Sequence, residues 1–247
     1  FDLHSGLVSQ MIVSPLRTHD MKHVAQLHPL MREAEVLLGD DAFGTYAHLA
    51  LLLRAKMHGL FPLHHCRIVD FTPGRAHTRE GNKAVAGMPR TKWIASLGEE
   101  DQLVEWFKPK ARPNWMRQEE FDLLPESITV RETRRIVKLK DGRRIVVSIV
   151  STFLDATAYP AKALIELRQR RWEVEIDLRY LKTAMKMEVL RCKTVAGVNR
   201  EIAVYLLVYN LVRTIMLEAA GHQKVAPRRI SFADALYWAR YAAARAE

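Results

Sequence analysis

The chain has 247 residues, of which 49% are hydrophobic and 27% are charged, a balance that excludes an intrinsically disordered protein. Lysine and arginine outnumber aspartate and glutamate by 38 to 28, so the formal net charge is +10. A charge of this sign and size favours a polyanionic partner, although a basic composition alone does not establish one.

The first 65 residues alternate between short apolar runs and helical patterns. Strand composition predicts strands over residues 6–13, 35–38 and 60–63. Apolar residues at helical spacing predict helices over residues 20–31 and 45–58. This strand–helix–strand alternation predicts an α/β fold whose strands run parallel.

Asp40 stands where the predicted strand 35–38 ends and the chain turns towards the next helix. Open α/β sheets place ligands and catalytic groups at the carboxyl ends of their strands. Aspartate is equally suited to shaping a tight turn. The residues alone leave these two roles of Asp40 evenly balanced.

Between residues 66 and 148 helical periodicity stops and prolines recur, which predicts a β-rich insertion. Strand composition is found at residues 66–71, 128–130 and 134–139. Asp141-Gly142, flanked by apolar runs, predicts a hairpin turn.

Basic side chains are dense in this insertion, and Trp93, Trp106 and Trp115 are interleaved with them. Cations neutralise a nucleic-acid backbone and aromatic rings stack on bases, so the pattern suits nucleic-acid binding. Tryptophans that fill the core of the insertion would give the same pattern, and this alternative is favoured for each tryptophan taken singly.

The last hundred residues predict one buried strand followed by helices. Residues 144–154 are nearly all apolar, as expected of a strand that is buried on both faces. Residues 164–186 predict a continuous helix without glycine or proline, and residues 198–220 predict a core helix that is apolar nearly all round. Ser231 is expected to cap a final helix.

One face of the predicted helix 164–186 gathers charge around a single carboxylate. At 3.6 residues per turn, Arg171, Glu175 and Lys182 fall within roughly 40° of one another. Three further cations extend this stripe: Arg168, Arg179 and Lys186. A solvated helix with an ordinary surface ion pair would give the same pattern, and the pattern alone favours that simpler interpretation.

The same helix carries a known signature. Arg171, Glu175 and Lys182 resemble the Tyr-x2-Arg-x3-Glu-x6-Lys motif of bacterial insertion-sequence transposases of the DDE class, in the fourth insertion-sequence family. Arg168 stands at the usual tyrosine position. Trp172 follows the arginine, about 60° from Glu175 around the axis, and is expected to pack rather than to contact DNA.

A second motif points to the same family. Gly39-Asp40-x-x-Phe43-Gly44, after an apolar strand, is similar to the second aspartate motif of these transposases. Asp41 stands where that motif usually has arginine. The resemblance covers essentially the whole chain and includes the position of the β-rich insertion between this aspartate and the glutamate.

The resemblance implies a ribonuclease-H-like α/β core with a β-rich insertion. Residues 1–65 would form the first part of the core, residues 66–148 the insertion, and residues 149–247 the rest of the core with the glutamate-bearing and C-terminal helices. The family places its first catalytic aspartate on an earlier strand. Neither Asp2 nor Asp20 stands in that context, so we expect an amino-terminally truncated transposase with two of three metal ligands.

The implied activity is metal-dependent DNA strand cleavage and transfer at insertion-sequence ends, by a cut-and-paste route. Asp40 and Glu175 would hold Mg²⁺ or Mn²⁺, which activates the attacking oxygen and stabilises the leaving oxygen. Arg171 and Lys182 would contact phosphates beside the cut strand. The DNA-binding set would be Arg168, Arg171, Arg179, Lys182 and Lys186.

The implied partner is double-stranded DNA, both transposon ends and target, and the sequence leaves open whether two copies pair on it as a homodimer. Three alternatives remain: a non-catalytic DNA-binding remnant, an unrelated metal-dependent nuclease that uses Asp40, Asp41 and Glu175, and a binder of acidic proteins or membrane surfaces. The last explains the charge but neither motif.

Cysteine usage and hydropathy bear on metal sites and location. Cys66 and Cys192 provide no disulfide framework, which suits a reducing cytoplasm. His64 and His65 precede Cys66, but no second ligand cluster at a zinc spacing accompanies them, which disfavours zinc.

The most apolar segment, residues 202–217, contains Asn210 and Arg213, so a buried helix is favoured over a membrane span.

Overall fold

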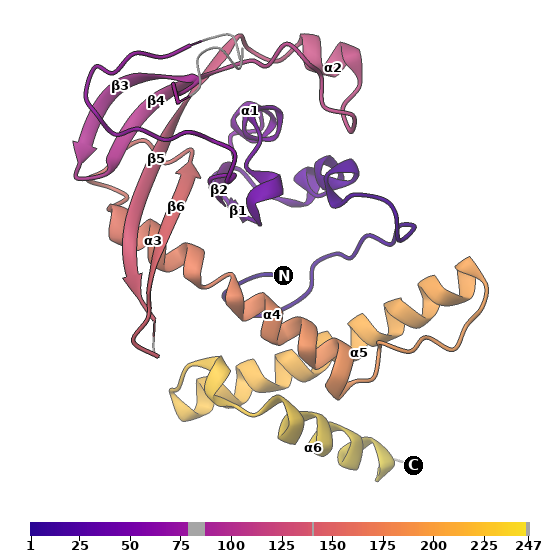
Figure 1. Cartoon of the computed structure of the whole chain (residues 1–247). Helices are drawn as coiled ribbons and strands as arrows, with labels where there is room; N and C mark the ends of the chain where they lie inside the picture. Colours follow the sequence, from indigo (N-terminus) through magenta and orange to yellow (C-terminus); the bar gives the residue numbers. More distant parts are fainter. Residues whose placement is uncertain (79–86, 140, 246–247) are drawn as a thin grey trace. The chain divides into compact units, whose positions relative to one another are not determined.

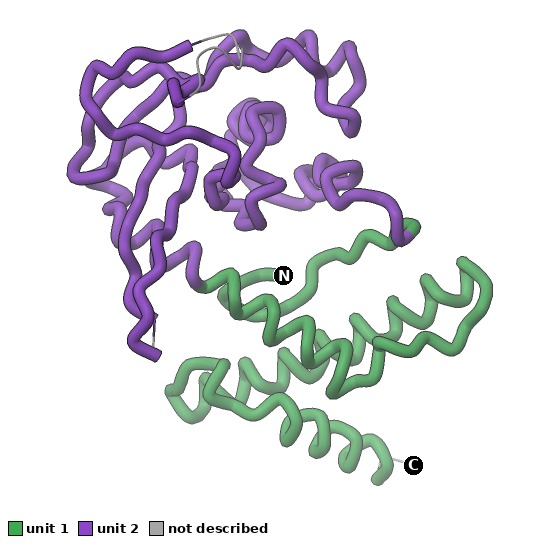
Figure 2. The backbone as a smooth tube through the Cα atoms, viewed as in Figure 1, with its two compact units in different colours: residues 1–15, 170–247 green, residues 16–169 purple. Residues whose placement is uncertain are grey.

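The computed structural model describes residues 1–78, 87–139 and 141–245, which fold into two compact units. Unit 1 consists of Phe1–Pro15 and Arg170–Glu247, and unit 2 of Leu16–Gln169 (Figure 2). The division into a core and an insertion at residues 65 and 148 remains a prediction.

Unit 2 is organised by a mixed sheet, which has six strands in the described part of the chain (Figure 1). The strands lie in the order β1-β2-β6-β5-β4-β3. Their bounds are β1 Val36–Leu38, β2 His58–Pro62, β3 Thr91–Gly98, β4 Asp101–Phe107, β5 Ser127–Lys138 and β6 Arg144–Ser151. The fold class is therefore α/β, but only β1 and β2 pair in parallel, and every other neighbouring pair is antiparallel.

The helices of unit 2 are short. Their bounds are α1 Tyr46–Arg54, α2 Gln118–Asp122 and α3 Ala161–Gln169, with 3₁₀ turns at Asp20–Lys22, Val24–Gln26, His28–Leu30 and Asp41–Phe43. The α-helix expected over residues 20–31 is thus a series of 3₁₀ turns. Pro29 has no N–H with which to continue an α-helical ladder. The second predicted helix begins after Thr45, as expected, but ends at Arg54, shortly before Lys56 takes a positive φ of 55°.

Two clusters of buried apolar side chains cover opposite faces of this sheet. On one face Leu49 of α1 packs with Phe61 of β2 and Trp106 of β4. On the other face Leu164 of α3 packs with Leu60 and Ile149. Successive residues of a strand point to opposite faces, so Leu60 lies in the cluster around α3 and Phe61 lies in the cluster around α1. The sheet is thereby held between α1 and α3.

The strands within residues 66–148 were predicted only in part. The hairpin between β5 and β6 is confirmed, with Gly142 at φ +87° in its turn; Lys140, beside that turn, lies outside the described residues. Residues 66–71 contain no strand, whereas β3 and β4 were not predicted. The strands within residues 66–148 continue the sheet begun by β1 and β2, because β5 pairs with β6 and β6 with β2.

Burial along β6 corrects the expectation of a strand covered on both faces. Ile149, Val150 and Ser151 are fully buried, but Ile145 and Val146 are 39% and 63% exposed. The exposed half pairs only with the end of β5 in the hairpin. Only the second half of β6 has a neighbour on each side, β5 and β2.

Unit 1 consists of an amino-terminal arm and helices. Their bounds are α4 Trp172–Arg179, a π-helical turn Tyr180–Ala184, α5 Val195–Gln223, a 3₁₀ turn Pro227–Arg229 and α6 Phe232–Ala244. Ser231 caps α6 as predicted, accepting the N–H of Asp234 at 3.3 Å. Leu181, Tyr209 and Phe232 lie in the buried core that joins these helices.

The arm is not the strand predicted over residues 6–13. Polar side chains of α5 bind its backbone instead. The side-chain amide of Asn210 accepts from the N–H and donates to the carbonyl of Val8, each at 2.9 Å. The Tyr209 hydroxyl donates to the carbonyl of Gly6 at 3.0 Å. A helix thus satisfies backbone groups that another strand would otherwise bind.

The continuous helix predicted over residues 164–186 is interrupted. Helix α3 ends at Gln169 and α4 begins at Trp172. At the break the N–H groups of Glu173 and Val174 bind carbonyls three residues back, at Arg170 and Arg171. Single-residue propensities do not reveal this break, because the residues around it are good helix formers. The boundary between the two units falls at the same place.

Helix α5 is buried on one side only. Tyr209, Val212 and Met216 are at most 1% exposed, whereas Leu207 and Leu211 are 70% and 57% exposed, so the expected all-round burial is wrong. By length and composition α5 is the one helix of the described residues that could cross a membrane. The buried side of α5 packs against the arm and α6.

Candidate functional site

The first candidate carboxylate stands at the carboxyl end of β1. Asp40 caps the 3₁₀ turn Asp41–Phe43 with an extended backbone, and its Oδ1 accepts the N–H of Ala42 at 3.1 Å. The side chain is exposed, and its Oδ2 has no partner among the described residues. Asp40 therefore shapes the turn, as one interpretation of the sequence predicted, and still presents an oxygen to solvent.

Close packing explains why residues 39 and 44, on either side of Asp40 and Phe43, are glycines. A Cβ atom at Gly39 would lie 2.9 Å from the ring of Phe43, and one at Gly44 would lie 3.0 Å from the carbonyl oxygen of Pro62. The Phe43 ring is folded back over Gly39, and Gly44 lies against the end of β2. Spacing within the motif therefore reflects how the turn packs on its neighbour strand.

A buried histidine supports the turn from α1. Nδ1 of His48 lies 2.8 Å from the carbonyl oxygen of Phe43, and its Nε2 lies 3.0 Å from Nε2 of His28. Burial lowers the pKa of His48 to about 4 and also lowers that of His28. At neutral pH both rings are uncharged, so His48 donates to Phe43 without placing a charge beside Asp40 and Asp41.

The second candidate carboxylate lies on α4. Glu175 is exposed, and its Oε1 is 3.0 Å from Nη1 of Arg171 across one helical turn. Arg171 also lies over the ring of Trp172, with its guanidinium carbon 5.3 Å from the ring centre. Trp172 is 63% exposed, so the expectation that it packs is wrong.

The other cations of the predicted stripe are divided by the helix breaks. Arg168 lies on α3 in unit 2, whereas Arg179 ends α4 in unit 1. Lys182 lies in the π-helical turn, and Lys186 follows it with a positive φ of 64°. The α-helical angle that placed Lys182 beside Glu175 does not hold through a π turn. The structure thus brings Arg171 and Glu175 together, and it places Asp40 in unit 2 and Glu175 in unit 1.

A buried acid two residues after Glu175 was not predicted from the sequence. Asp177 is 1% exposed, and its carboxylate lies 2.9 Å from Nη2 of Arg228 and 3.8 Å from Nη1 of Arg213. Arg213 also donates to the carbonyl of Ser5 in the arm. A single arginine within an apolar stretch, here Arg213 in residues 202–217, indicates a buried acidic partner and could have revealed Asp177.

Unit 2 also buries charge that composition does not reveal. Glu132 of β5 accepts from the indole N–H of Trp106 and from the side-chain amide of Gln102, each at 2.9 Å. Burial raises the pKa of Glu132, and the guanidinium of Arg67 lies 3.4 Å from the centre of the Trp106 ring. Trp106 is 1% exposed, so for this tryptophan the core-filling alternative is correct.

Comparison with known proteins supports what the two motifs suggest. A family model described as "Transposase DDE domain" matches residues 1–211. The chain belongs to the DDE transposase family. Asp40 and Glu175 both fall within the matched region, and so do all five cations of the proposed DNA-binding set.

A curated relative narrows the family to the insertion-sequence type. This transposase-family chain is 31% identical over 145 residues to "Transposase InsG for insertion sequence element IS4" of Escherichia coli (strain K12). The aligned part covers 57% of this chain and 30% of the relative. The resemblance to IS4-type transposases is thus confirmed, and the chain spans about a third of the relative's length.

Proposed function

We propose that this chain carries part of the catalytic machinery of an insertion-sequence transposase, which cuts and joins double-stranded DNA with divalent metal ions. The observation that carries the proposal is the match to the transposase family over residues 1–211, within which Asp40 and Glu175 are both exposed carboxylates. We further propose a ribonuclease-H-like core, a cut-and-paste reaction at transposon ends and a cytoplasmic location. Pairing of two copies on the DNA is part of the same proposal.

The donor set suits a hard divalent cation. Oδ2 of Asp40 and Oε2 of Glu175 are oxygen donors on exposed side chains, and Mg²⁺ and Mn²⁺ prefer carboxylate oxygens. When bound, such ions activate the attacking oxygen and stabilise the leaving oxygen of a phosphodiester. Asp40 is held for this role by its own cap to Ala42 and by the His48 contact behind the turn.

Arg171 is suited to bind and orient a phosphate near Glu175. Its Nη1 contacts Glu175, while its Nε is covered and has no hydrogen-bond partner among the described residues. The planar guanidinium carries further N–H donors, whose fork matches the oxygens of a phosphate. Lys182 would act beside it as a point charge, and Arg168, Arg179 and Lys186 would bind the DNA backbone.

Lanthanide luminescence tests the metal site without requiring catalysis. Tb³⁺ is a hard ion that binds oxygen ligands, and the exposed indole of Trp172 stands three residues from Glu175 to sensitise its emission. We expect emission that Mg²⁺ or Mn²⁺ competes away and that Asp40→Asn and Glu175→Gln each weaken. Asp20→Asn and Glu188→Gln are matched controls, because both residues are exposed acids outside the motifs. Equal effects of all four substitutions would contradict the assignment.

A nicking assay then tests the activity. We expect Mg²⁺-dependent cleavage of a labelled duplex by the chain and none by the Asp40→Ala, Glu175→Ala double variant. DNA binding that falls steeply with salt, together with no cleavage, would instead identify a non-catalytic DNA-binding remnant. The remnant is favoured by one observation: one oxygen of each carboxylate already has a hydrogen-bond partner, Ala42 for Asp40 and Arg171 for Glu175.

The proposed DNA-binding set can be tested separately. Replacing Lys182 or Lys186 singly with alanine should lower affinity for duplexes of any sequence and flatten the salt dependence, since the lost phosphate contact reduces the slope by about 1. Lys22→Ala is the matched control, an exposed lysine of unit 2 outside the set. An equal loss with Lys22→Ala would show that only the net charge matters.

A further inference from the structure

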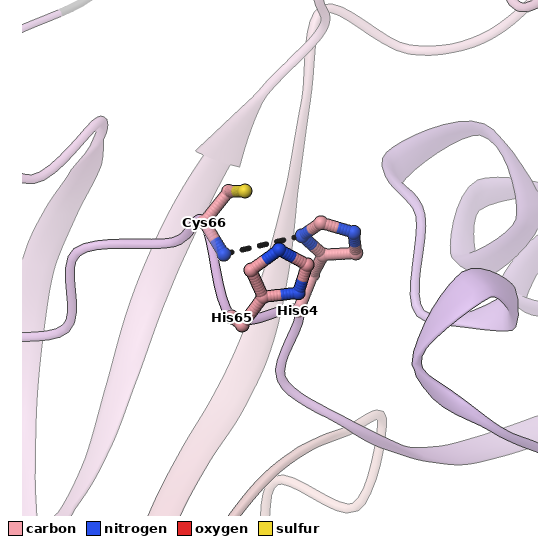
Figure 3. Close-up of side chains that lie close together, drawn as sticks. All are labelled: His64, His65 and Cys66. Carbon is pink, nitrogen blue, oxygen red and sulfur yellow. Dashed lines mark hydrogen bonds between the residues drawn. The ribbon is translucent and has the colours of Figure 1, made fainter.

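Three side chains of types that bind metal ions lie together in the loop that follows β2. His64, His65 and Cys66 each offer one ligand atom, and these three atoms all lie within 4.8 Å of one another (Figure 3). The two imidazole rings stack with their centres 4.3 Å apart. The backbone N–H of Cys66 donates to Nδ1 of His64 at 3.2 Å, which holds that ring against the cysteine.

The spacing of these atoms suits one small transition-metal ion. Zinc bonds of about 2.0–2.3 Å to nitrogen and sulfur place tetrahedral ligand atoms about 3.3–3.8 Å apart. Small rotations of the half-buried His64 and of the exposed His65 and Cys66 would close the rest of the distance. Two imidazoles and a thiolate are borderline-to-soft ligands, which favour Zn²⁺ and other late first-row ions over Mg²⁺. Three protein ligands leave a fourth position for water.

A carboxylate from the neighbouring turn supports this cluster. Because β1 and β2 pair in parallel, the chain leaves both strands at the same edge of the sheet, so the turn after β1 adjoins the loop after β2. Oδ2 of Asp41 lies 3.8 Å from Nδ1 of His65. A carboxylate that contacts the ring of a metal-bound histidine orients that ring and increases its basicity.

We propose that His64, His65 and Cys66 form a transition-metal site for Zn²⁺ or a similar ion, with Asp41 as the carboxylate that positions His65. This site is separate in chemistry from the carboxylate site proposed for Mg²⁺. Its ligands all lie in unit 2, and its occupancy would tie the loop after β2 to the turn that contains Asp40. The inference does not depend on the proposed function, because it needs neither DNA nor activity.

The chain provides an internal control for a test by thiol protection. Cys66 and Cys192 are both exposed and free, but only Cys66 has histidine neighbours in the cluster. The metal-free protein and the protein with equimolar Zn²⁺ are alkylated in parallel, and the rate at each cysteine is followed by peptide mass spectrometry. We expect Zn²⁺ to slow labelling of Cys66 by at least about tenfold, because a metal-bound thiolate is withheld from alkylation, and to leave Cys192 unchanged.

Cobalt absorption gives a second readout. Co²⁺ bound to a thiolate has a charge-transfer band, which should be present in the native chain and in Cys192→Ser and absent in Cys66→Ser. Zn²⁺ should displace the cobalt. Asp41→Asn should weaken zinc binding by about tenfold, as expected for loss of a supporting carboxylate.

Several results would overturn the inference. They are equal protection of both cysteines, no protection of either, or protection of Cys66 that persists in a His64→Ala, His65→Ala double variant. The last would show that the thiol binds metal alone. Failure of the terbium experiment would leave these results unchanged, so the two metal sites are tested independently.

Discussion

The buried ion pair between β4 and β5 provides the sharpest test of how unit 2 is held together. Nε and Nη2 of Arg131 bind the two oxygens of Asp101 at 2.8 and 2.5 Å, and the side chains are 0% and 3% exposed. Thr133 donates to the same carboxylate at 2.8 Å. The change Asp101→Asn keeps the shape but removes the charge that compensates the guanidinium. We expect it to lower the free energy of unfolding by about 3–5 kcal/mol, the usual cost of leaving a buried charge unpaired.

The hairpin of the same sheet provides the matched control. Arg143 and Asp141 also form an ion pair, at 2.7 Å, but their side chains are 74% and 49% exposed. Because water screens exposed pairs, Asp141→Asn should cost less than about 1 kcal/mol. Urea unfolding of both variants, followed by circular dichroism and tryptophan fluorescence, measures the difference. If Asp101→Asn is no more destabilising than Asp141→Asn, the inference that buried charge pairing stabilises this sheet is wrong.

Two further predictions concern unfolding. As pH falls from 6.5 towards 4, His48 becomes protonated in the unfolded chain but stays neutral in the folded chain, so the free energy of unfolding should fall by up to about 3 kcal/mol in urea titrations. His48→Gln should flatten that pH dependence, and an unchanged profile would contradict the lowered pKa of His48. Gly6→Ala places a Cβ 1.9 Å from Nη2 of the buried Arg213 and should make the arm more susceptible to proteolysis. Gly74→Ala is the control, because Gly74 also has a positive φ but its Cβ would have no atom within 4 Å, and equal cleavage of the arm in both variants would refute the packing argument.

Local patterns predicted those parts of the fold that depend on neighbours in sequence. The β1–α1–β2 unit, the Asp141-Gly142 hairpin and the cap at Ser231 each follow from residues a few positions apart. The two motifs around Asp40 and Glu175 were likewise visible in sequence, since glycine spacing and helical spacing are local. Family membership followed from them and is confirmed.

Tertiary structure decided what distant residues do to one another. The arm at residues 6–13 has strand composition, but Asn210 and Tyr209 bind its backbone and no strand forms. Residues 164–186 have helical propensity throughout, yet the chain passes from one compact unit to the other within them, and the helix breaks there.

Which charged side chains are buried also depends on residues that are distant in sequence. Asp177 and Glu132 look like ordinary surface acids in the sequence, and their partners Arg213 and Trp106 lie 36 and 26 residues away. A polar group enters a core only where a partner satisfies it, and that partner is a matter of three-dimensional packing. Sequence alone therefore predicted the family, which is confirmed, and the two carboxylate motifs, which stay a prediction. The folded chain decided which charges are buried, where the long helix breaks and what lies beside Asp41.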